Sequence, residues 1–568
     1  MKLFAVGLAA LVALLAGPTP AAAAASHALI QGSGSSWAAN AVNQWVADVA
    51  NQGLQVVFTA NGSGQGRKDY ANRTTDFGVS DIPFGAVRDP GTHETDDSQG
   101  RSFAYLPIAA GGTAFPYHID VGRTRVRNLR LSGQTVAKIF TGQITNWNDP
   151  AVTHDNNGHA LPSLPIIPVV HAEAAGVSGQ FSRYLSKQFP SIWKACNGSA
   201  DETEYFPVNC GKARGNEKAF TGSDGVMNFI KSAGANGSIG LEEYSYPLLS
   251  GFPSAKLLNA AGYYTLPTQY NVAVALTKAK INQDPSSPNY LIQNLDSVYT
   301  NPDRRTYALS SYVYAIIPTA SDDSRMSTAK RQTLADFLYY SICQGQQEIG
   351  PIGYSSLPIN LVEAGFDQIG KLKKADPKVD LNRRNVSTCH NPTFIAGQPQ
   401  VNHLAVIAPQ PAACDRSGAG PCDANQGTYN ANPGGSGGTA GNGSGNGSGH
   451  SGTGGGGSGR GGTGGAGGTS GPGGTGASTA GPGATPGATA TSGPAAGGGN
   501  GALGLSLTDG GDGTAAGGDA APVATTLAAD QGQSGNWPLL VLAVGLFIGA
   551  LATPIGVRTW LARRGGSA

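Results

Sequence analysis

Two hydrophobic patterns alternate along the chain from residue 27 to about residue 400. Short apolar runs rich in β-branched residues predict strands. They lie at 54–60, 103–110 and 166–170. Apolar residues at helical spacing predict helices over 40–50 and 331–343. Because strands alternate with helices, we expect α/β architecture with a sizeable core.

The hydrophobic pattern ends before the C-terminal part of the chain. Residues 431–536 are dominated by Gly, Ser, Thr, Ala and Pro, and many of the 85 glycines gather there. Such a composition buries too little apolar surface to order itself. We therefore predict a disordered linker over 431–536. Its part from 431 to 519, as a flexible coil of about 90 residues, would span on the order of 50 Å.

Two apolar segments outside this region predict targeting and anchoring. Lys2, an apolar run and a small-residue zone predict a signal peptide over residues 1–25, with cleavage near Ala25. Residues 537–557 are uncharged and mostly apolar, and as a helix of about 31 Å they would cross a bilayer. The arginines of 558–568 predict a cytoplasmic tail. A buried core helix is the other interpretation of the span, but no core follows the linker. We expect a single-pass protein of the cell membrane with its N-terminal domain outside the cytoplasm.

Charge and cysteine content narrow the function classes. Lys and Arg number 37 against 36 Asp and Glu, and this balance predicts no nucleic-acid partner. Six cysteines behind a signal peptide predict disulfides, although free buried thiols are the alternative. Among the many pairings that six cysteines allow, we favour Cys196–Cys210, Cys343–Cys389 and Cys414–Cys422. No C-x-x-C occurs, and we predict neither a metal site nor a cofactor.

Three short segments near the N-terminus together predict an anion site. They are 32–37 (Gly-Ser-Gly-Ser-Ser-Trp), 61–66 (Asn-Gly-Ser-Gly-Gln-Gly) and 76–81 (Asp-Phe-Gly-Val-Ser-Asp). The first two are loops before expected helices, so their N–H groups and hydroxyls can face an anion where the helix dipole favours negative charge. The third ends a strand-like run in a carboxylate, which favours a ligand that carries a proton. Monohydrogen phosphate carries such a proton, whereas sulfate does not.

These segments and several longer motifs resemble the phosphate-binding protein of the high-affinity phosphate ABC transporter. The further motifs lie at 106–112, 131–133, 139–150, 237–244 and 353–358. The resemblance covers residues 27 to about 370 and implies a two-lobe periplasmic-binding-protein (Venus-flytrap) fold that closes over its ligand by a hinge. By analogy, the predicted parts are lobe one (27–112 and 306–400), lobe two (113–305) and a Cys-containing extension (401–430).

The resemblance also implies ligand contacts in lobe one. Ser36 stands where a hydroxyl binds phosphate, and Trp37 stands where an aromatic residue offers its backbone N–H. Ser63 matches the serine of the second loop, and Asp81 matches the aspartate that accepts the ligand's proton. Ser36 and Ser63 could instead be helix N-caps. Asp81 could be a turn residue.

The fourth ligand loop departs from the family pattern Arg-x-Asp-Gly-Ser-Gly-Thr. Residues 171–177 read His-Ala-Glu-Ala-Ala-Gly-Val, so Gly176 keeps its place but an arginine and two hydroxyls are lost. Hydrogen bonds to charged groups contribute roughly 1.5–3 kcal/mol each, so phosphate binding could weaken by several powers of ten. A protonated His171 would substitute in part, in a pH-dependent way, since its unperturbed pKa is about 6.5. A neutral His171 without ligand contact is the alternative. An alignment with an insertion would instead make residues 178–180 the donors of this loop.

Two functions fit these features. The first is a membrane-tethered receptor that binds inorganic phosphate and delivers it to the permease subunits of an ABC transporter. The second is a diverged, non-transport member, a surface sensor or interaction module with weak or altered oxyanion binding. An enzyme is disfavoured, because no nucleophile-elbow G-x-S-x-G precedes an ordered acid and histidine. We therefore predict no catalytic residue.

Overall fold

The computed structural model describes residues 27–87, 94–207, 210, 216–382 and 384–423. All of them fall within the first of two units, which ends at Asn446. None of the helices in these ranges has the length and hydropathy of a membrane span. The predicted signal peptide, linker, membrane span and cytoplasmic tail lie outside the described residues.

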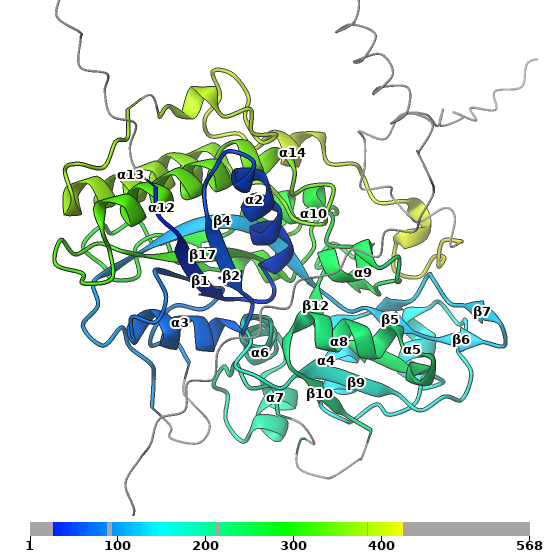
Figure 1. Cartoon of the computed structure of the whole chain (residues 1–568). Helices are drawn as coiled ribbons and strands as arrows, with labels where there is room; N and C mark the ends of the chain where they lie inside the picture. The colour runs from blue at the N-terminus through cyan, green and yellow to red at the C-terminus, as the bar shows by residue number, and fades with distance from the viewer. Residues whose placement is uncertain (1–26, 88–93, 208–209, 211–215, 383, 424–568) are drawn as a thin grey trace, which may run out of the picture. The chain divides into compact units, whose positions relative to one another are not determined.

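A six-stranded sheet with the order β12-β4-β17-β3-β1-β2 forms the upper part of the molecule in Figure 1. Its strands are β1 (Ile30–Gly34), β2 (Val56–Thr59), β3 (Phe77–Ser80), β4 (Phe103–Ala114), β12 (Glu242–Glu243) and β17 (Ser310–Pro318). β1 is parallel to β2 and β3, whereas β17 is antiparallel to β3 and β4. β4 and β17 are buried along nearly their whole length, as in sheets covered on both faces.

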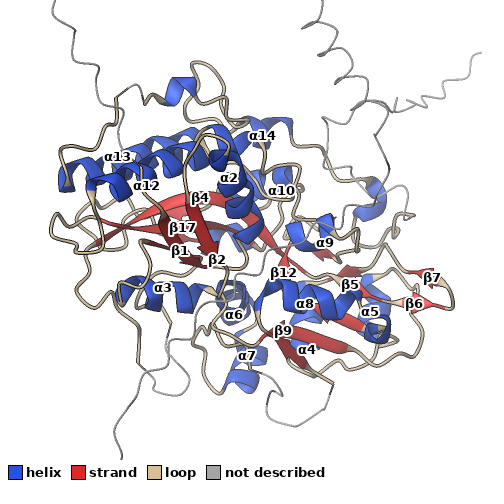
Figure 2. Cartoon of the chain, viewed as in Figure 1, coloured by secondary structure: helices blue, strands red, loops and turns tan. Residues whose placement is uncertain are grey.

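Helices cover this first sheet. They are α2 (Ala39–Ala50), α3 (Ser63–Ala71), α10 (Gln269–Leu276), α12 (Thr328–Ile342) and α13 (Ile359–Ala375). In Figure 2, α12 and α13 lie above the sheet and α3 lies below it. Apolar positions of α2 recur at helical spacing and are buried, and the indole of Trp45 donates to the carbonyl of Gly345 at 3.0 Å. This bond ties α2 to the segment after α12.

A second sheet, with the order β10-β9-β11-β5, lies in the lower part of Figure 1. Its strands are β5 (Tyr117–His118), β9 (Ile167–His171), β10 (Lys218–Phe220) and β11 (Ser238–Gly240). The remaining helices before α12 are α4 (Gly133–Phe140), α5 (Pro150–Asp155), α6 (Gly176–Gln188), α7 (Pro190–Asn197), α8 (Gly222–Lys231), α9 (Ser245–Leu249) and α11 (Asp296–Tyr299). The aromatic rings of Phe115, Phe140 and Phe181 pack together with centroids 5.3–5.7 Å apart. These rings give the second part of the fold a core that includes α4 and α6.

Three small β-structures complete the described strands. One sheet has the order β14-β13-β8, and two ribbons pair β15 with β16 and β6 with β7. Their bounds are β6 (Asp120–Val121), β7 (Thr124–Arg125), β8 (Arg130–Leu131), β13 (Lys256–Leu258), β14 (Tyr264–Thr265), β15 (Lys280–Ile281) and β16 (Gln293–Asn294).

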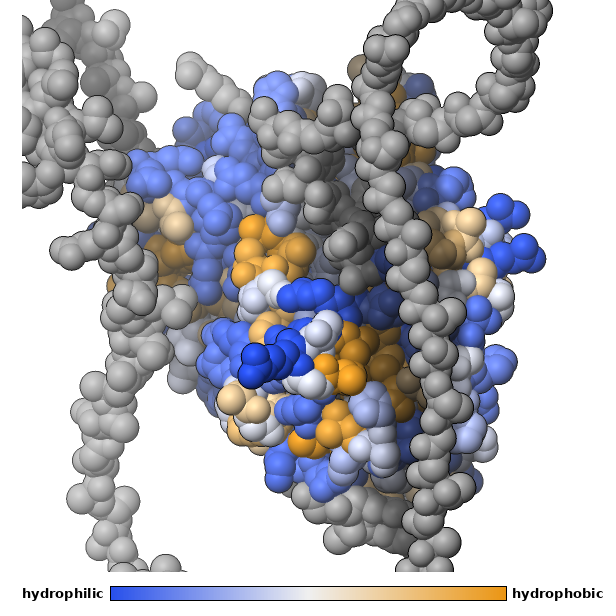
Figure 3. All heavy atoms as spheres, turned by 90° about the vertical axis from the view of Figure 1, so that its right-hand side faces the viewer, coloured by the Kyte–Doolittle hydropathy of each residue, from blue (hydrophilic) through white to orange (hydrophobic). Residues whose placement is uncertain are grey.

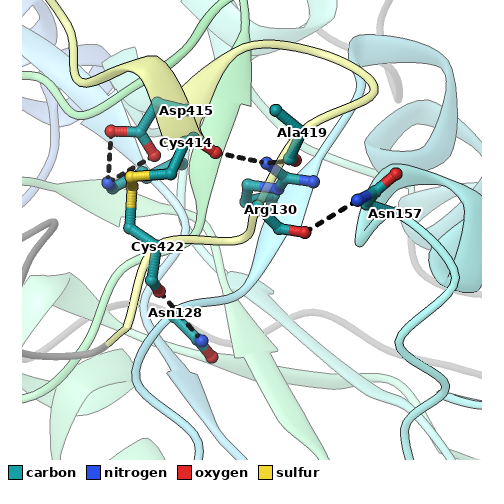
Figure 4. The surroundings of a disulfide bond; sticks show 9 residues. Asn128, Arg130, Asn157, Cys414, Asp415, Ala419 and Cys422 are labelled. Carbon is teal, nitrogen blue, oxygen red and sulfur yellow. Dashed lines mark hydrogen bonds and ion pairs between the residues drawn. A yellow bond between two sulfur atoms is a disulfide. The ribbon is translucent and has the colours of Figure 1, made fainter.

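Residues 401–423 pack back onto this body. Helix α14 (His403–Ile407) lies against α10 and buries Leu404 there. Further on, the disulfide Cys414–Cys422 closes a short loop that surrounds the side chain of Arg130 (Figure 4). The Arg130 guanidinium donates to the carbonyls of Cys414 at 3.0 Å and Ala419 at 2.6 Å. The extension therefore supplies two acceptors to a buried cation of β8, whose Nε has no partner among the described residues.

The surface shows scattered apolar side chains. Figure 3 shows a face on which hydrophilic residues separate smaller hydrophobic areas. Among the described residues, the exposed large hydrophobic side chains are Leu29, Val57, Val121, Leu249, Val406 and Ile407. Val406 and Ile407 are neighbours in α14, whereas the other four lie apart in the sequence.

The structure confirms much of the predicted organisation. β2, β4 and β9 occupy the predicted strand positions, and α2 and α12 occupy the predicted helices. The described residues have the mixed α/β, two-lobe fold that the sequence predicted, and all three favoured disulfides are present. The lobe boundaries stay a prediction. Helix α10, which lies in the range predicted for lobe two, packs on β4 and β17 of the first sheet.

Candidate functional site

The first-lobe loops meet at one edge of the first sheet. β1 and β3 are parallel neighbours, so their carboxyl ends share that edge, where α/β proteins bind ligands. Gly34 ends β1 with a φ of +140°, and a Cβ on it would lie 1.9 Å from the carbonyl oxygen of Val79. A Cβ on Gly66 of α3 would lie 2.3 Å from the Cα of Gly34. Glycine at both positions lets the start of α3 lie directly against the end of β1.

Two serine hydroxyls converge on Asp81 at this edge. The hydroxyls of Ser35 and Ser63 each donate to Asp81 Oδ2 at 2.7 Å. Asp81 Oδ1 is buried and has no hydrogen-bond partner within the described ranges. Burial raises the pKa of Asp81 to about 6, although the two hydroxyl bonds oppose the rise. The carboxylate thus has one fully occupied oxygen and one available acceptor.

Neither Ser36 nor Ser63 acts as an N-cap. The N-caps of α2 and α3 are Ala38 and Gly62, and neither helix has a side-chain cap. Ser36 is buried, and its hydroxyl oxygen lies 3.2 Å from that of Ser223. The capping alternative is therefore wrong for both serines. Asp81 does lie in a bend directly after β3, and its carboxylate accepts bonds from two other loops, so its role as a ligand residue stays a prediction.

Trp37 sits beside the same edge with its ring buried. The hydroxyl of Tyr354 donates to the carbonyl oxygen of Trp37 at 2.7 Å, and the two ring centroids lie 5.7 Å apart. The hydroxyl of Tyr246 similarly donates to the carbonyl of Ser36 at 2.7 Å. Two tyrosines from distant parts of the chain therefore hold the backbone of the first loop in place.

The segment 171–177 faces these loops. Gly176 begins α6, and a Cβ on it would lie 1.9 Å from Asp81 Oδ2, so only glycine fits there. The amide of Gly64 donates to the carbonyl of Ala174 at 3.0 Å, and the side-chain amide of Gln180 donates to the carbonyl of Asp81 at 3.0 Å. The structure thus brings Gly176 together with Ser63 and Asp81. Ser178 is fully buried, and its hydroxyl has no hydrogen-bond partner in the described part of the chain.

His171 ends β9 and is buried between two carboxylates. Its Nδ1 lies 2.8 Å from Glu173 Oε1, and its Nε2 lies 3.5 Å from Glu242 Oε2. Burial alone would lower the pKa of His171, but the bonds and charges of the two carboxylates outweigh it and raise the pKa to about 10. The expected titration near neutral pH is therefore wrong, because His171 stays charged there. The raised pKa also argues against a neutral His171, whereas its contact with the ligand stays a prediction.

The two carboxylate partners of His171 differ. Burial raises the pKa of Glu242, and the bond to His171 opposes that rise. Burial would also raise the pKa of Glu173, but its bond to His171 prevails and the pKa is lowered. Glu173 Oε2 also accepts the amide of Gly222 at 3.1 Å. Glu173 therefore links His171, at the end of β9, to the start of α8.

The described residues contain no group of three or more His, Cys, Asp or Glu side chains that could hold a metal ion. The groups that the site presents to a ligand are hydroxyl donors, helix N-termini and buried carboxylates. Such a set suits a small anion that carries hydrogen.

Comparison with known proteins identifies the family to which this architecture belongs. Residues 19–344 match the family model described as "PBP superfamily domain". The chain belongs to the PBP superfamily. This membership agrees with the two-lobe α/β fold.

Curated relatives and a solved structure are similar to part of this PBP-superfamily chain. The phosphate-binding protein PstS of Xylella fastidiosa is 29% identical over 346 residues, which are 61% of this chain and 85% of that protein. PstS 2 of Mycobacterium tuberculosis is 30% identical over 335 residues, which are 58% of this chain and 83% of that protein. The crystal structure of DING protein has a TM-score of 0.45 and 18% identity, and covers 63% of this chain and 97% of that chain.

The sequence interpretation missed two features of this PBP-superfamily site. Ser35, which the sequence analysis did not single out, donates to Asp81 from the same Gly-Ser loop that holds Ser36. Arg67 of α3 forms a buried bidentate pair with Glu204, with N–O distances of 2.9 and 2.5 Å. It also binds Asp96 at 2.6 Å. Arg67 follows the second loop at helical spacing, but nothing in the sequence pointed to a carboxylate 137 positions away.

Proposed function

We propose that this chain is an extracytoplasmic phosphate-binding protein that delivers inorganic phosphate to the permease subunits of an ABC importer. The observation that carries the proposal is the convergence of Ser35 and Ser63 on the buried Asp81. Family membership and relatives that carry the name phosphate-binding protein support it.

Asp81 supplies the selectivity in this proposal. Its unpartnered Oδ1 accepts the hydrogen of monohydrogen phosphate. Sulfate has no such hydrogen, and its charge would face the buried carboxylate without a bond between them, which disfavours it. The hydroxyl of Ser36 and the backbone N–H of Trp37 are the proposed donors to the remaining phosphate oxygens. The hydroxyl of Ser63, which donates to Asp81 here, would join them by turning from Asp81 to the ligand.

Helix N-termini provide electrostatic support. α3 begins at Ser63, and α6 begins at Gly176 beside Asp81. Each N-terminus carries about half a positive charge from the helix dipole. In a buried site these partial charges favour an anion without a full cation.

The C-terminal part of the chain completes the proposal. The predicted linker 431–536 and membrane span 537–557 would hold the binding domain at the outer face of the cell membrane. A tether of this kind would keep the domain near permease subunits in the same membrane.

The second candidate function is a diverged surface sensor or interaction module. The position of His171 favours it, because the histidine is flanked by Glu173 and Glu242 and lacks the unopposed charge of the family arginine. Ala175 and Val177 offer no hydroxyls. Weak or altered oxyanion binding would follow from these losses.

Equilibrium dialysis of the whole chain in detergent, with radiolabelled phosphate, separates the two functions. Submicromolar affinity with little competition from sulfate supports the receptor. No binding at millimolar phosphate refutes it and supports the module. In the same assay Asp81→Asn should change the phosphate-to-sulfate preference, because an amide can also donate a hydrogen bond. An unchanged preference would remove Asp81 from the proposed site.

A further inference from the structure

We infer that Ser223, in the first turn of α8, is a ligand-binding hydroxyl that replaces the donors missing at residues 175 and 177. The inference rests on the proposed function. It adds Ser223, a residue of α8, to the anion site. The Ser223 hydroxyl would contact the anion from the second lobe.

The position of Ser223 relative to Ser36 carries the inference. The two hydroxyl oxygens lie 3.2 Å apart, and the side chains are 1% and 5% exposed. In the structure the Ser223 hydroxyl donates to that of Ser36. Once it turns from Ser36, both hydroxyls can donate to one anion oxygen about 2.8 Å from each. Ser36 follows β1 of the first sheet, whereas Ser223 belongs to a helix that packs on β9 of the second. A shared anion oxygen would therefore join the two parts of the fold.

The local structure holds α8 in the orientation that this role needs. Gly222 has a φ of +71°, a conformation that favours glycine, and its amide donates to Glu173 at 3.1 Å. Glu173 in turn binds His171. The segment 171–177 thereby acts as a support that fixes the start of α8. Its acidic side chain is used to position a helix whose N-terminal dipole favours an anion.

Two further observations point to a ligand at this place. Glu242 belongs to β12, which contacts α8, and its buried Oε1 has no hydrogen-bond partner in the described chain. Asp81 accepts a bond from Ser35, the neighbour of Ser36, and its buried Oδ1 has no hydrogen-bond partner in the described chain; nor does the fully buried hydroxyl of Ser178. Such unpaired buried groups are costly unless they serve a ligand or the chemistry of a site.

The expected effect follows from the strength of one hydrogen bond to a charged group. Removal of such a bond weakens binding by roughly tenfold to a hundredfold. Ser223→Ala should raise the dissociation constant for phosphate by this factor. Ser223→Thr keeps the hydroxyl and should restore most of the affinity.

The test measures phosphate binding by the whole chain in detergent for the wild type, Ser223→Ala, Ser223→Thr and the control Ser341→Ala. Ser341 is a buried helical serine of α12 whose hydroxyl donates to the carbonyl of Phe337 at 2.8 Å. The control should bind phosphate like the wild type. The melting temperature of each variant shows whether a change in affinity reflects loss of folding.

The possible results separate the inference about Ser223 from the proposed function. A wild type that binds phosphate, with Ser223→Ala weakened at least tenfold and Ser223→Thr close to wild type, supports the inference. A wild type that binds and a Ser223→Ala variant of equal affinity overturns it and leaves the proposed function intact. Equal weakening of the Thr and Ala variants also overturns it, because a retained hydroxyl should matter. A wild type that does not bind millimolar phosphate refutes the proposed function and the inference together.

Discussion

Asp81→Asn should stabilise the protein at neutral pH even though it removes a proposed ligand group. Burial raises the pKa of Asp81 from 3.8 to about 6, against the opposing bonds from Ser35 and Ser63. A tenfold change in an ionisation constant corresponds to about 1.4 kcal/mol, so the ionised carboxylate costs the folded state about 3 kcal/mol. An asparagine oxygen can accept the same two hydroxyl bonds without that cost. Asp81→Asn would therefore raise the free energy of unfolding while it removes the carboxylate proposed to bind the ligand.

The sign of the pH dependence follows from the two pKa values of Asp81. From about pH 4 to about pH 6 the folded state holds the proton and the unfolded state does not, so the stability of the wild type falls as the pH rises. The cost is complete above pH 6 and absent below about pH 4. The advantage of Asp81→Asn should therefore reach about 3 kcal/mol near pH 8 and shrink as the pH falls toward 4.

Urea unfolding in phosphate-free buffer, followed by tryptophan fluorescence at several pH values, measures this difference. Asp76→Asn is the matched control, because Asp76 is equally buried but lies 2.8 Å from both Arg325 and Lys330. Its neutralisation should destabilise the protein near neutral and alkaline pH. The reasoning fails if Asp81→Asn unfolds at lower urea than the wild type near pH 8, or if its advantage is the same at all pH values.

Three further substitutions test the buried charges and the extension. His171→Gln should cost roughly 3–5 kcal/mol near pH 7, because two buried carboxylates lose their cation. The folded pKa of His171 is about 10 and the unfolded value about 6.5, so its contribution is full below pH 6.5 and lost toward pH 10. A stability difference that stays constant over this interval would contradict the pairing. Glu204→Gln should also cost roughly 3–5 kcal/mol in urea unfolding, since Arg67 keeps its charge in the interior, and an unchanged midpoint would argue against the buried pair. Replacing Cys414 and Cys422 by serine should cost about 2–3 kcal/mol and reduce hydrogen-exchange protection around β8 but not in the first sheet. Loss of protection throughout would rule out a local role.

Local sequence signals determined the elements and the partners that lie close in sequence. Apolar runs and helical spacing predicted β2, β4, β9, α2 and α12, because strand and helix periodicity depend on neighbouring residues. The Gly-Ser loops were predictable for the same reason, since glycine is needed where backbones approach closely. The disulfides Cys196–Cys210 and Cys414–Cys422 each join cysteines that are near in the chain.

Only the tertiary structure decided what the side chains of the site do. Arg67 pairs with Glu204, and Ser36 meets Ser223, across 137 and 187 positions of sequence. His171 is charged because folding buries it between carboxylates from two segments, and its residue type alone suggested a pKa near neutrality. A hydrogen bond or a pKa depends on atoms within a few ångströms, and a single sequence does not specify which distant segments supply those atoms.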